Sequence, residues 1–266
     1  MDIKGTITTL LRDGFILVFN QDKLDIVRTA QALVAAGPLG AGVNNMEVTC
    51  RISKPLEKLA RLRKELPDFA AGMASLIDSA EMLEVYNKAH PADPLPSVEE
   101  AVDAGACYLV SGVNFSDKSY EQFAGRVAMI PGCSSAGEVV SQFSKGANLC
   151  KVFPAKELGG AGFVKAIDAP LHKIISLVPT GGTSATNIPD YIDAGVLVLG
   201  ASFSMIEKAT MKKIIDDQDY ELLAKELLAV KHIIDTLRAE KYPGIDFARA
   251  SAEEISHATG RNFNIG

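Results

Sequence analysis

The chain has 266 residues, of which 47% are hydrophobic and 23% are charged, a composition typical of a globular protein. Its net charge is −6 and no basic run stands out, so we expect neither nucleic acid nor an anionic membrane as a partner. No apolar run approaches the roughly 20 residues of a membrane helix, and the N-terminus lacks the apolar segment of a signal peptide.

Cysteine and histidine usage indicates the compartment and argues against a metal site. The four cysteines have no C-x-x-C spacing and lie in or beside expected strands, which favours reduced thiols and a cytoplasmic protein. The four histidines have no metal-ligand spacing, so no metal and no other cofactor is expected. These residues are Cys50, Cys107, Cys133 and Cys150, and His90, His172, His232 and His257.

Short β-type runs alternate with helical stretches, which predicts βα units and a parallel sheet. Helices are expected at 2–12, 22–36, 54–65, 79–89, 97–104, 117–124, 135–144, 162–168, 187–193 and 203–210. Strands are expected at 14–19, 45–51, 69–75, 107–112, 127–132, 149–154, 174–180 and 196–201. The strands and the helices between them predict an α/β fold, a (β/α)8 TIM barrel with an N-terminal helix. A doubly wound sheet would also alternate, but no G-x-G-x-x-G follows the first strand.

The C-terminal residues predict extra helices. Residues 218–240 form an amphipathic pattern, and Ser251-Ala-Glu-Glu254 is a capping box that begins a short helix ending at Gly260. We therefore expect a single domain over 1–266, with the barrel at about 10–210 and a helical extension at about 211–266. The extension is expected to cover a barrel face or an oligomer contact.

Lys151 lies inside the apolar run 149–154, which is unusual because burying an ammonium group is costly. A desolvated lysine has a lowered pKa and can attack carbonyl carbons as a neutral amine. The alternative is an edge lysine whose ammonium reaches solvent.

The second strand places polar side chains opposite Lys151. Glu47, Thr49 and Arg51 alternate with apolar residues, which predicts that these three side chains point into the barrel. Strands two and six are opposed across an eight-stranded barrel, so Glu47 and Arg51 are expected to face Lys151. A structural salt-bridge network is the alternative, although buried ion pairs stabilise proteins poorly.

A glycine-rich corner follows strands seven and eight. Pro179-Thr-Gly-Gly-Thr183 comes after strand seven, and Gly200-Ala-Ser202 ends strand eight before a helix. Backbone N–H groups at this position commonly bind phosphate in such barrels. A simple turn is the alternative.

Several motifs together resemble the KDPG/KHG aldolases, which are class I, pyruvate-dependent aldolases. The resemblance covers about residues 10–210 and occurs in the family's order. The matching segments are Met46-Glu-Val-Thr-Cys-Arg51 (family L-E-V-T-x-R), Ile130-Pro-Gly132 with Glu138, Lys151-Val-Phe-Pro-Ala155, Gly159-Gly160, Pro179-Thr-Gly-Gly182 and Gly200-Ala-Ser202.

The resemblance implies a role for each matched residue. Lys151 resembles the Schiff-base lysine, Glu47 the general acid/base and Arg51 the group that binds the substrate carboxylate. Phe153 resembles an apolar pocket wall. Positions that resemble the phosphate site are Thr180, Gly181, Gly182, Gly200 and Ser202. The implied substrate is a small keto acid, expected to be phosphorylated, and the implied assembly is a homotrimer.

Some segments depart from the family pattern. The family reads G-A-G-T-V at the end of strand three, where this chain reads Ala70-Ala-Gly-Met-Ala74, so Met73 is expected at a substrate-binding position. The family reads S-P-G after strand four, where this chain reads Ser111-Gly-Val113. Insertions at 37–45 and 91–96 are expected to be peripheral, away from the catalytic ends of the strands.

The expected reaction is reversible cleavage of a 2-keto-3-deoxy-6-phosphosugar acid to pyruvate and glyceraldehyde 3-phosphate. One alternative is an unphosphorylated substrate such as 4-hydroxy-2-oxoglutarate, which would give pyruvate and glyoxylate. A second is a metal-dependent or phosphosugar isomerase barrel. The third is a non-catalytic barrel that binds a phosphorylated keto acid.

Overall fold

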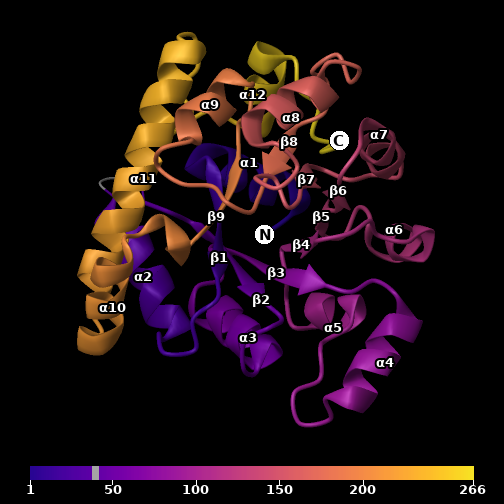
Figure 1. The fold of residues 1–266 in the computed structure, drawn as a ribbon, viewed down its shortest axis with the longest axis vertical. Helices are drawn as coiled ribbons and strands as arrows, with labels where there is room; N and C mark the ends of the chain where they lie inside the picture. Colours follow the sequence, from indigo (N-terminus) through magenta and orange to yellow (C-terminus); the bar gives the residue numbers. More distant parts are fainter. Residues whose placement is uncertain (38–41) are drawn as a thin grey trace.

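The computed structural model describes residues 1–37 and 42–266, in which parallel strands alternate with helices (Figure 1). The strands are β1 (Phe15–Phe19), β2 (Asn45–Thr49), β3 (Ala70–Leu76), β4 (Tyr108–Ser111), β5 (Ala128–Ile130), β6 (Gly132–Cys133), β7 (Cys150–Val152), β8 (Leu177–Pro179) and β9 (Leu199–Ser202). The helices are α1 (Ile3–Asp13), α2 (Ile26–Ala36), α3 (Pro55–Glu65), α4 (Ala80–Ala89), α5 (Val98–Asp103), α6 (Asp117–Phe123), α7 (Ala136–Ser144), α8 (Gly160–Asp168), α9 (Ile188–Asp193), α10 (Lys208–Asp217), α11 (Tyr220–Lys241) and α12 (Ala252–Thr259).

The predicted elements are confirmed with two local differences. The expected fifth strand is divided into β5 and β6 at Pro131, which has no N–H to donate to a sheet. The helix expected at 203–210 is instead a short 3-10 turn, Phe203–Met205, followed by α10. Ser202 begins this turn by accepting a hydrogen bond from the backbone N–H of Ser204.

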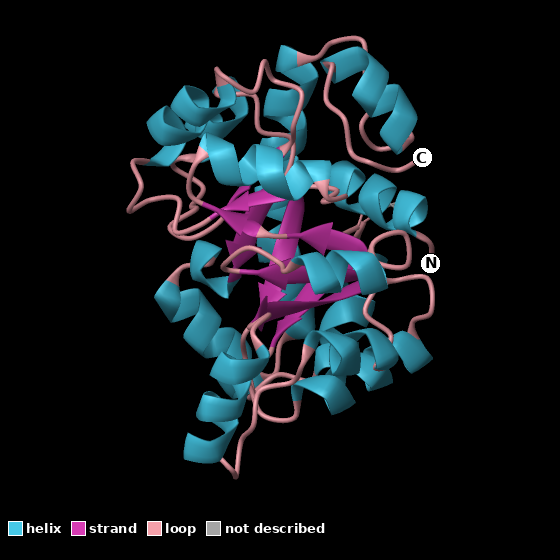
Figure 2. Cartoon of the chain, turned by 90° about the vertical axis from the view of Figure 1, so that its right-hand side faces the viewer, coloured by secondary structure: helices cyan, strands magenta, loops and turns pink. Residues whose placement is uncertain are grey.

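The strands form two parallel sheets. One has six strands in the order β5-β4-β3-β2-β1-β9, and the other has the order β6-β7-β8. Only Pro131 separates β5 from β6 in the chain, and β8 lies beside β9. Figure 2 shows the strands flanked by helices on both sides. The structure is therefore an α/β fold in which a parallel sheet curves through half of a barrel.

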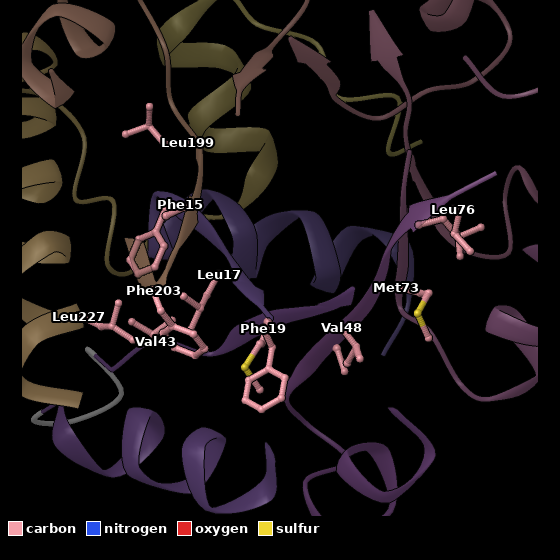
Figure 3. Packing of buried hydrophobic residues seen from close by; sticks show 14 of the residues in the cluster. Phe15, Leu17, Phe19, Val43, Val48, Met73, Leu76, Leu199, Phe203 and Leu227 are labelled. Carbon is pink, nitrogen blue, oxygen red and sulfur yellow. The ribbon is translucent and has the colours of Figure 1, made fainter. Parts of the chain in front are cut away.

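Alternation along the strands divides the core into two clusters. An outer cluster lies between strands and helices and contains Phe15, Leu17, Val48 and Met73 (Figure 3). An inner cluster, which contains Tyr108 among others, lies inside the curve of the sheets. The expected outward face of β2 is confirmed, because Met46, Val48 and Cys50 all belong to the outer cluster.

The C-terminal residues close one end of the inner core. Phe247, Ile255 and Phe263 are buried in the inner cluster. The side-chain amide of Asn148, just before β7, donates to the backbone oxygens of Phe263 and Asn264 at 3.1 and 2.9 Å. Residues 247–264 therefore cover the amino ends of the strands and leave the carboxyl ends open.

Helix α11 occupies a different position from this C-terminal cover. It packs between α9 and α2 in the ring of helices, where it is seen along one side of the molecule in Figure 1. Its buried side chains include Leu223, Leu227 and Ile234. It thereby takes the place of the helix that follows the last strand.

Candidate active site

A cavity of about 850 Å³ opens at the carboxyl ends of the strands. Its wall is built from β2, β7 and the loops that follow β3, β8 and β9. It includes every sequence-predicted site residue except Met73: Glu47, Arg51, Lys151, Phe153, Thr180, Gly181, Gly182, Gly200 and Ser202. The fold thus brings segments separated by more than 100 residues into one site.

Lys151 lies in the middle of β7, between Gly132 of β6 and Val178 of β8. The side chain is only 6% exposed, and its polar end reaches the cavity. Burial lowers the pKa of the amine below its ordinary value of 10.5, while the negative charge of Glu47 raises it. The ammonium also lies 4.7 Å from the centroid of the Phe153 ring. The edge-lysine alternative is therefore wrong.

Glu47 faces the same cavity from β2 and is 3% exposed. Burial raises the pKa of its carboxyl from 4.5 to about 7, and the charge of Lys151 opposes that shift. Within the described part of the chain, none of the ion pairs involves Glu47, Arg51 or Lys151. The alternative of a structural salt-bridge network therefore does not hold.

Arg51 differs from its predicted position. β2 ends at Thr49, and Arg51 lies in the following turn, where it is exposed at the cavity wall rather than inside the barrel. Burial and the charge of Glu47, and not the charge of Arg51, are the causes that set the pKa of Lys151. An exposed guanidinium at the mouth is still well placed to meet an incoming anion.

Met73 is not a site residue. Its side chain is fully buried in the outer core and points toward the helices with Val48 and Phe19 (Figure 3). Ser75, two residues later, lines the cavity, and its Oγ lies 3.0 Å from Oγ1 of Thr49. The family pattern G-A-G-T-V therefore fits Gly72-Met-Ala-Ser-Leu76, which places Ser75 at the threonine position.

Gly72 supports this revised alignment. A Cβ at Gly72 would lie 2.4 Å from the ring of Tyr108, so no larger residue fits there. Tyr108 fills the inner core below the cavity and belongs to the same buried layer as Ala70 and Ala74. In the sequence, the spacing of Gly72 and Ser75, a glycine followed three residues later by a hydroxyl residue, could have identified Ser75.

The glycine corner is formed by β8 and β9 where they end. Gly181 and Gly182 have left-handed φ values of 91° and 75°. In the described residues, neither of their N–H groups donates to a protein acceptor. Gly200 is needed for close approach, since its Cβ would lie 2.0 Å from Oγ1 of Thr180. Ser202 adds a partly exposed hydroxyl, so the corner presents several donors to an anion.

Phe153 forms an apolar wall between two loops. Its ring is 40% exposed and lies against the positions of Gly112 and Gly181. A Cβ at Gly112 would lie 3.7 Å from the ring, which is an ordinary contact distance. The departure from S-P-G at Ser111-Gly-Val113 therefore leaves the position of Phe153 intact.

The segments 91–96 and 37–45, both expected to be peripheral, lie at different ends of the strands. The expectation that 91–96 is peripheral is wrong, because Leu95 lines the cavity together with Met82 and Tyr86 of α4. The connection that contains this segment begins with α4 after the carboxyl end of β3, which is the end where the cavity opens. Of the first insertion, Asn44 lies at the opposite end, where its N–H donates to Asp13 at 2.7 Å. Residues 38–41 lie outside the described residues.

Residues 1–37 and 42–266 contain neither a cluster of metal ligands nor a membrane-spanning helix. No group of three or more His, Cys, Asp or Glu side chains is arranged to hold a metal ion. No helix in that part of the chain combines the length and apolar character needed to cross a membrane.

Comparison with known proteins agrees with these features. The family model for KDPG and KHG aldolase matches residues 95–224. A 2-dehydro-3-deoxy-phosphogluconate aldolase of Pseudoalteromonas atlantica is 31% identical over 172 residues, which are 65% of this chain and 70% of that protein. The enzyme of the same name from Pseudomonas aeruginosa is 29% identical, over 84% of this chain and 91% of the relative.

A solved structure shows the same fold. The KDPG aldolase from Legionella pneumophila, with pyruvate captured as a covalent carbinolamine intermediate, superposes with a TM-score of 0.64. That match is 22% identical and covers 85% of this chain and 97% of the other. Together with the sequence relatives, this places the chain in the KDPG/KHG aldolase family.

Proposed function

We propose that the chain is a class I aldolase, an aldehyde-lyase that reversibly cleaves a 2-keto-3-deoxy-6-phosphosugar acid to pyruvate and glyceraldehyde 3-phosphate. The observation that carries this proposal is the buried amine of Lys151, with a lowered pKa, in one cavity with Glu47. The relatives named KDPG aldolase support the same substrate class.

Lys151 is the nucleophile in this proposal. Its neutral amine attacks the C2 ketone carbon, and loss of water from the carbinolamine gives a protonated imine. Burial favours the neutral amine, which is the reactive form. The imine then accepts the electron pair of the C3–C4 bond, so the aldehyde leaves and an enamine remains. Protonation at C3 and hydrolysis release pyruvate and restore the amine.

Glu47 moves the protons in these steps. It donates a proton as water leaves the carbinolamine and accepts the proton of the C4 hydroxyl as the C3–C4 bond breaks. A carboxyl with a pKa of about 7 is populated in both forms near neutral pH, so it can act as acid and base.

The other cavity residues hold the substrate. Arg51 and Ser75 bind the keto-acid carboxylate, and Phe153 packs against the carbon chain. The phosphate lies at the glycine corner, where its partners are Thr180, Gly181, Gly182, Gly200 and Ser202. The free N–H groups of this corner support that assignment.

Borohydride trapping tests the proposal. Incubation with pyruvate and borohydride is expected to reduce the imine and add one pyruvyl group at Lys151, located by peptide mass spectrometry. Lys151→Arg keeps the positive charge but lacks the amine nucleophile and is expected to remain unmodified. A wild-type protein that stays unmodified would contradict the mechanism.

A second candidate substrate is 4-hydroxy-2-oxoglutarate. An Escherichia coli relative named KHG/KDPG aldolase is 27% identical over 75% of this chain. The same N–H groups at the glycine corner suit a carboxylate as well as a phosphate. Comparing pyruvate release from phosphorylated and unphosphorylated substrates separates the two candidates. The non-catalytic alternative is not favoured, because the cavity contains both Lys151 and Glu47 and the departure at Met73 lies outside it.

The proposal extends to the architecture and the assembly. The two sheets are proposed to close into one eight-stranded barrel across Pro131 and between β8 and β9, in a single domain that includes the C-terminal helices. A homotrimer is proposed from the family, and light scattering would measure it. The four free, buried thiols support a reduced, cytoplasmic location, which cell fractionation would test.

A further inference from the structure

The connection between β3 and β4 contains two helices, α4 and α5. Helix α5 begins with a capping box at Ser97 and leads directly to β4. Helix α4 lies beyond it at the edge of the molecule in Figure 1, and none of its residues is buried. Burial of its own side chains therefore does not explain why this helix is present.

The polar side chains at the start of the β3–β4 connection make hydrogen bonds that position this connection. The carboxylate of Asp78 accepts hydrogen bonds from the Ser116 N–H at 2.6 Å and the Ser119 hydroxyl at 2.8 Å. The Ser79 hydroxyl accepts from the Met82 N–H at 3.3 Å and thereby caps α4. These groups line the cavity but already have protein partners.

The rest of the segment presents apolar groups to the cavity. Met82 and Tyr86 are four residues apart and share one face of α4. Leu95 is held beside them by two hydrogen bonds between its backbone and the side chain of Asn87. Asn87 Oδ1 accepts from the Leu95 N–H at 2.8 Å, and Asn87 Nδ2 donates to the Leu95 oxygen at 3.1 Å. All three belong to the cavity that contains Lys151. Met82 is 62% exposed, so a bound group would remove apolar surface from water.

We propose that Met82, Tyr86 and Leu95 form a specificity wall for an alkyl or aromatic group on the aldehyde-derived half of the substrate. This inference rests on the proposed function. In the condensation direction, the enamine of pyruvate on Lys151 attacks the aldehyde carbon and forms the C3–C4 bond. The aldehyde oxygen takes a proton and becomes the C4 hydroxyl, and water then releases the product from the lysine. An apolar substituent of the aldehyde lies against the wall, whereas the phosphate of glyceraldehyde 3-phosphate lies at the glycine corner.

Condensation of pyruvate with two aldehydes tests the wall. Benzaldehyde carries an aromatic group, and glyceraldehyde 3-phosphate carries a phosphate for the glycine corner. Met82→Ala and Tyr86→Ala are expected to lower kcat/KM for benzaldehyde by about tenfold each, because apolar pocket contacts discriminate by that order. Their kcat/KM for glyceraldehyde 3-phosphate, which carries no apolar substituent, should fall by a smaller factor than their kcat/KM for benzaldehyde.

Val85→Ala is the matched control. Val85 lies on the same helix, is 70% exposed and is not part of the cavity wall, so both activities should stay unchanged. The three variants should fold normally because α4 buries none of its residues, and circular dichroism would verify this.

Three results would overturn the inference while the proposed function stands. The first is that wild-type protein traps pyruvate but does not condense it with benzaldehyde. The second is that Met82→Ala and Val85→Ala change kcat/KM for benzaldehyde equally. The third is that the Met82 and Tyr86 variants lose kcat/KM only for glyceraldehyde 3-phosphate. Failure of wild-type protein to trap pyruvate at Lys151 would instead remove the proposed function and the inference with it.

Discussion

At the scale of single residues, burial moves two ionisable groups toward neutral pH from opposite directions. It lowers the pKa of Lys151 and raises that of Glu47 to about 7, because both charged forms are desolvated. Their mutual attraction opposes both shifts. Burial thus favours the neutral form of the Lys151 amine, in the same cavity as a carboxyl that can donate and accept protons, which suits the proposed imine chemistry.

Replacing Glu47 should separate activity from stability. Glu47→Gln is expected to lower kcat by about 10²- to 10⁴-fold through the loss of proton transfer. The native carboxyl binds a proton more tightly than the unfolded one, so its stabilising contribution is full below pH 4.5 and is lost as pH rises through about 7. Urea unfolding at pH 8 should therefore find the variant more stable, by up to roughly 3 kcal/mol.

The control for this measurement is Glu121→Gln, since Glu121 is exposed on α6. Its unfolding free energy should follow that of the wild type from pH 4 to pH 8. If Glu47→Gln showed the same pH dependence as the wild type, the raised pKa of Glu47 would not contribute to stability.

Ser75 and Met73 provide a second test at this scale. Ser75→Ala is expected to raise KM for the keto acid several-fold, because the variant lacks a hydroxyl in the cavity. The loss of one hydrogen bond should weaken substrate binding by about 1 kcal/mol. Met73→Leu conserves volume in the outer core and should cost less than about 1.5 kcal/mol of stability. Its KM should equal that of the wild type; a raised KM in Met73→Leu alone would restore the original alignment.

At the scale of elements, a buried ion pair fixes the C-terminal segment to helix α8. Arg261 makes two hydrogen bonds to Asp168 of α8, at 2.8 and 2.7 Å, and both side chains are at most 5% exposed. The same guanidinium donates to the backbone oxygens of Ile175 and Gly195. Residues from α8, the segment before β8 and the loop before β9 therefore meet at one side chain.

Removing Arg261 should leave Asp168 buried without its partner. Arg261→Ala is expected to lower the free energy of unfolding by about 3–5 kcal/mol. The comparison is Arg249→Ala, because the Arg249–Asp246 pair is 87% and 60% exposed and should contribute nothing measurable. Equal midpoints for the two variants in urea unfolding would refute the anchoring role of Arg261.

Some elements follow from the sequence pattern more directly than others. Periodicity identified the strands and helices, and the polar–apolar alternation of β2 correctly placed Glu47. β3 reads Ala-Ala-Gly-Met-Ala-Ser-Leu, which has no such alternation, so the face of Met73 could not be decided and was assigned wrongly. The strand also contains a register shift, and Ser75 has a left-handed φ of 62°. The position of α4 depends on three-dimensional contacts that no local pattern encodes.

At the scale of the whole molecule, the two ends of the parallel strands differ. The carboxyl ends of the strands hold the open cavity, whereas the amino ends are covered by α1, α12 and residues 247–264. The inner core, with Tyr108 at its centre, separates them. The C-terminal cover and the candidate site thus lie at opposite ends of the strands, an arrangement also found in (β/α)8 barrels.

This separation predicts that damage to the covered end spares the site. Phe263 is 1% exposed, so Phe263→Ala should lower the free energy of unfolding by about 3–5 kcal/mol. Pyruvate trapping at Lys151 should remain complete at a temperature where the variant is folded. Ile174→Ala, at a 47% exposed position, should change stability by less than about 0.5 kcal/mol. Loss of trapping in folded Phe263→Ala would show that the ends are coupled.

The C-terminal cover has a consequence for biosynthesis. Arg12 donates to the backbone oxygen of Ala250, 238 residues later, at 3.0 Å, and Asn148 bonds to Phe263 and Asn264. A ribosome releases the N-terminal strands first, so their inner face stays uncovered until the last βα unit and the residues after it have emerged. The nascent chain can therefore form these long-range contacts only after residues 247–264 have emerged, and the inner cluster stays exposed to solvent until then.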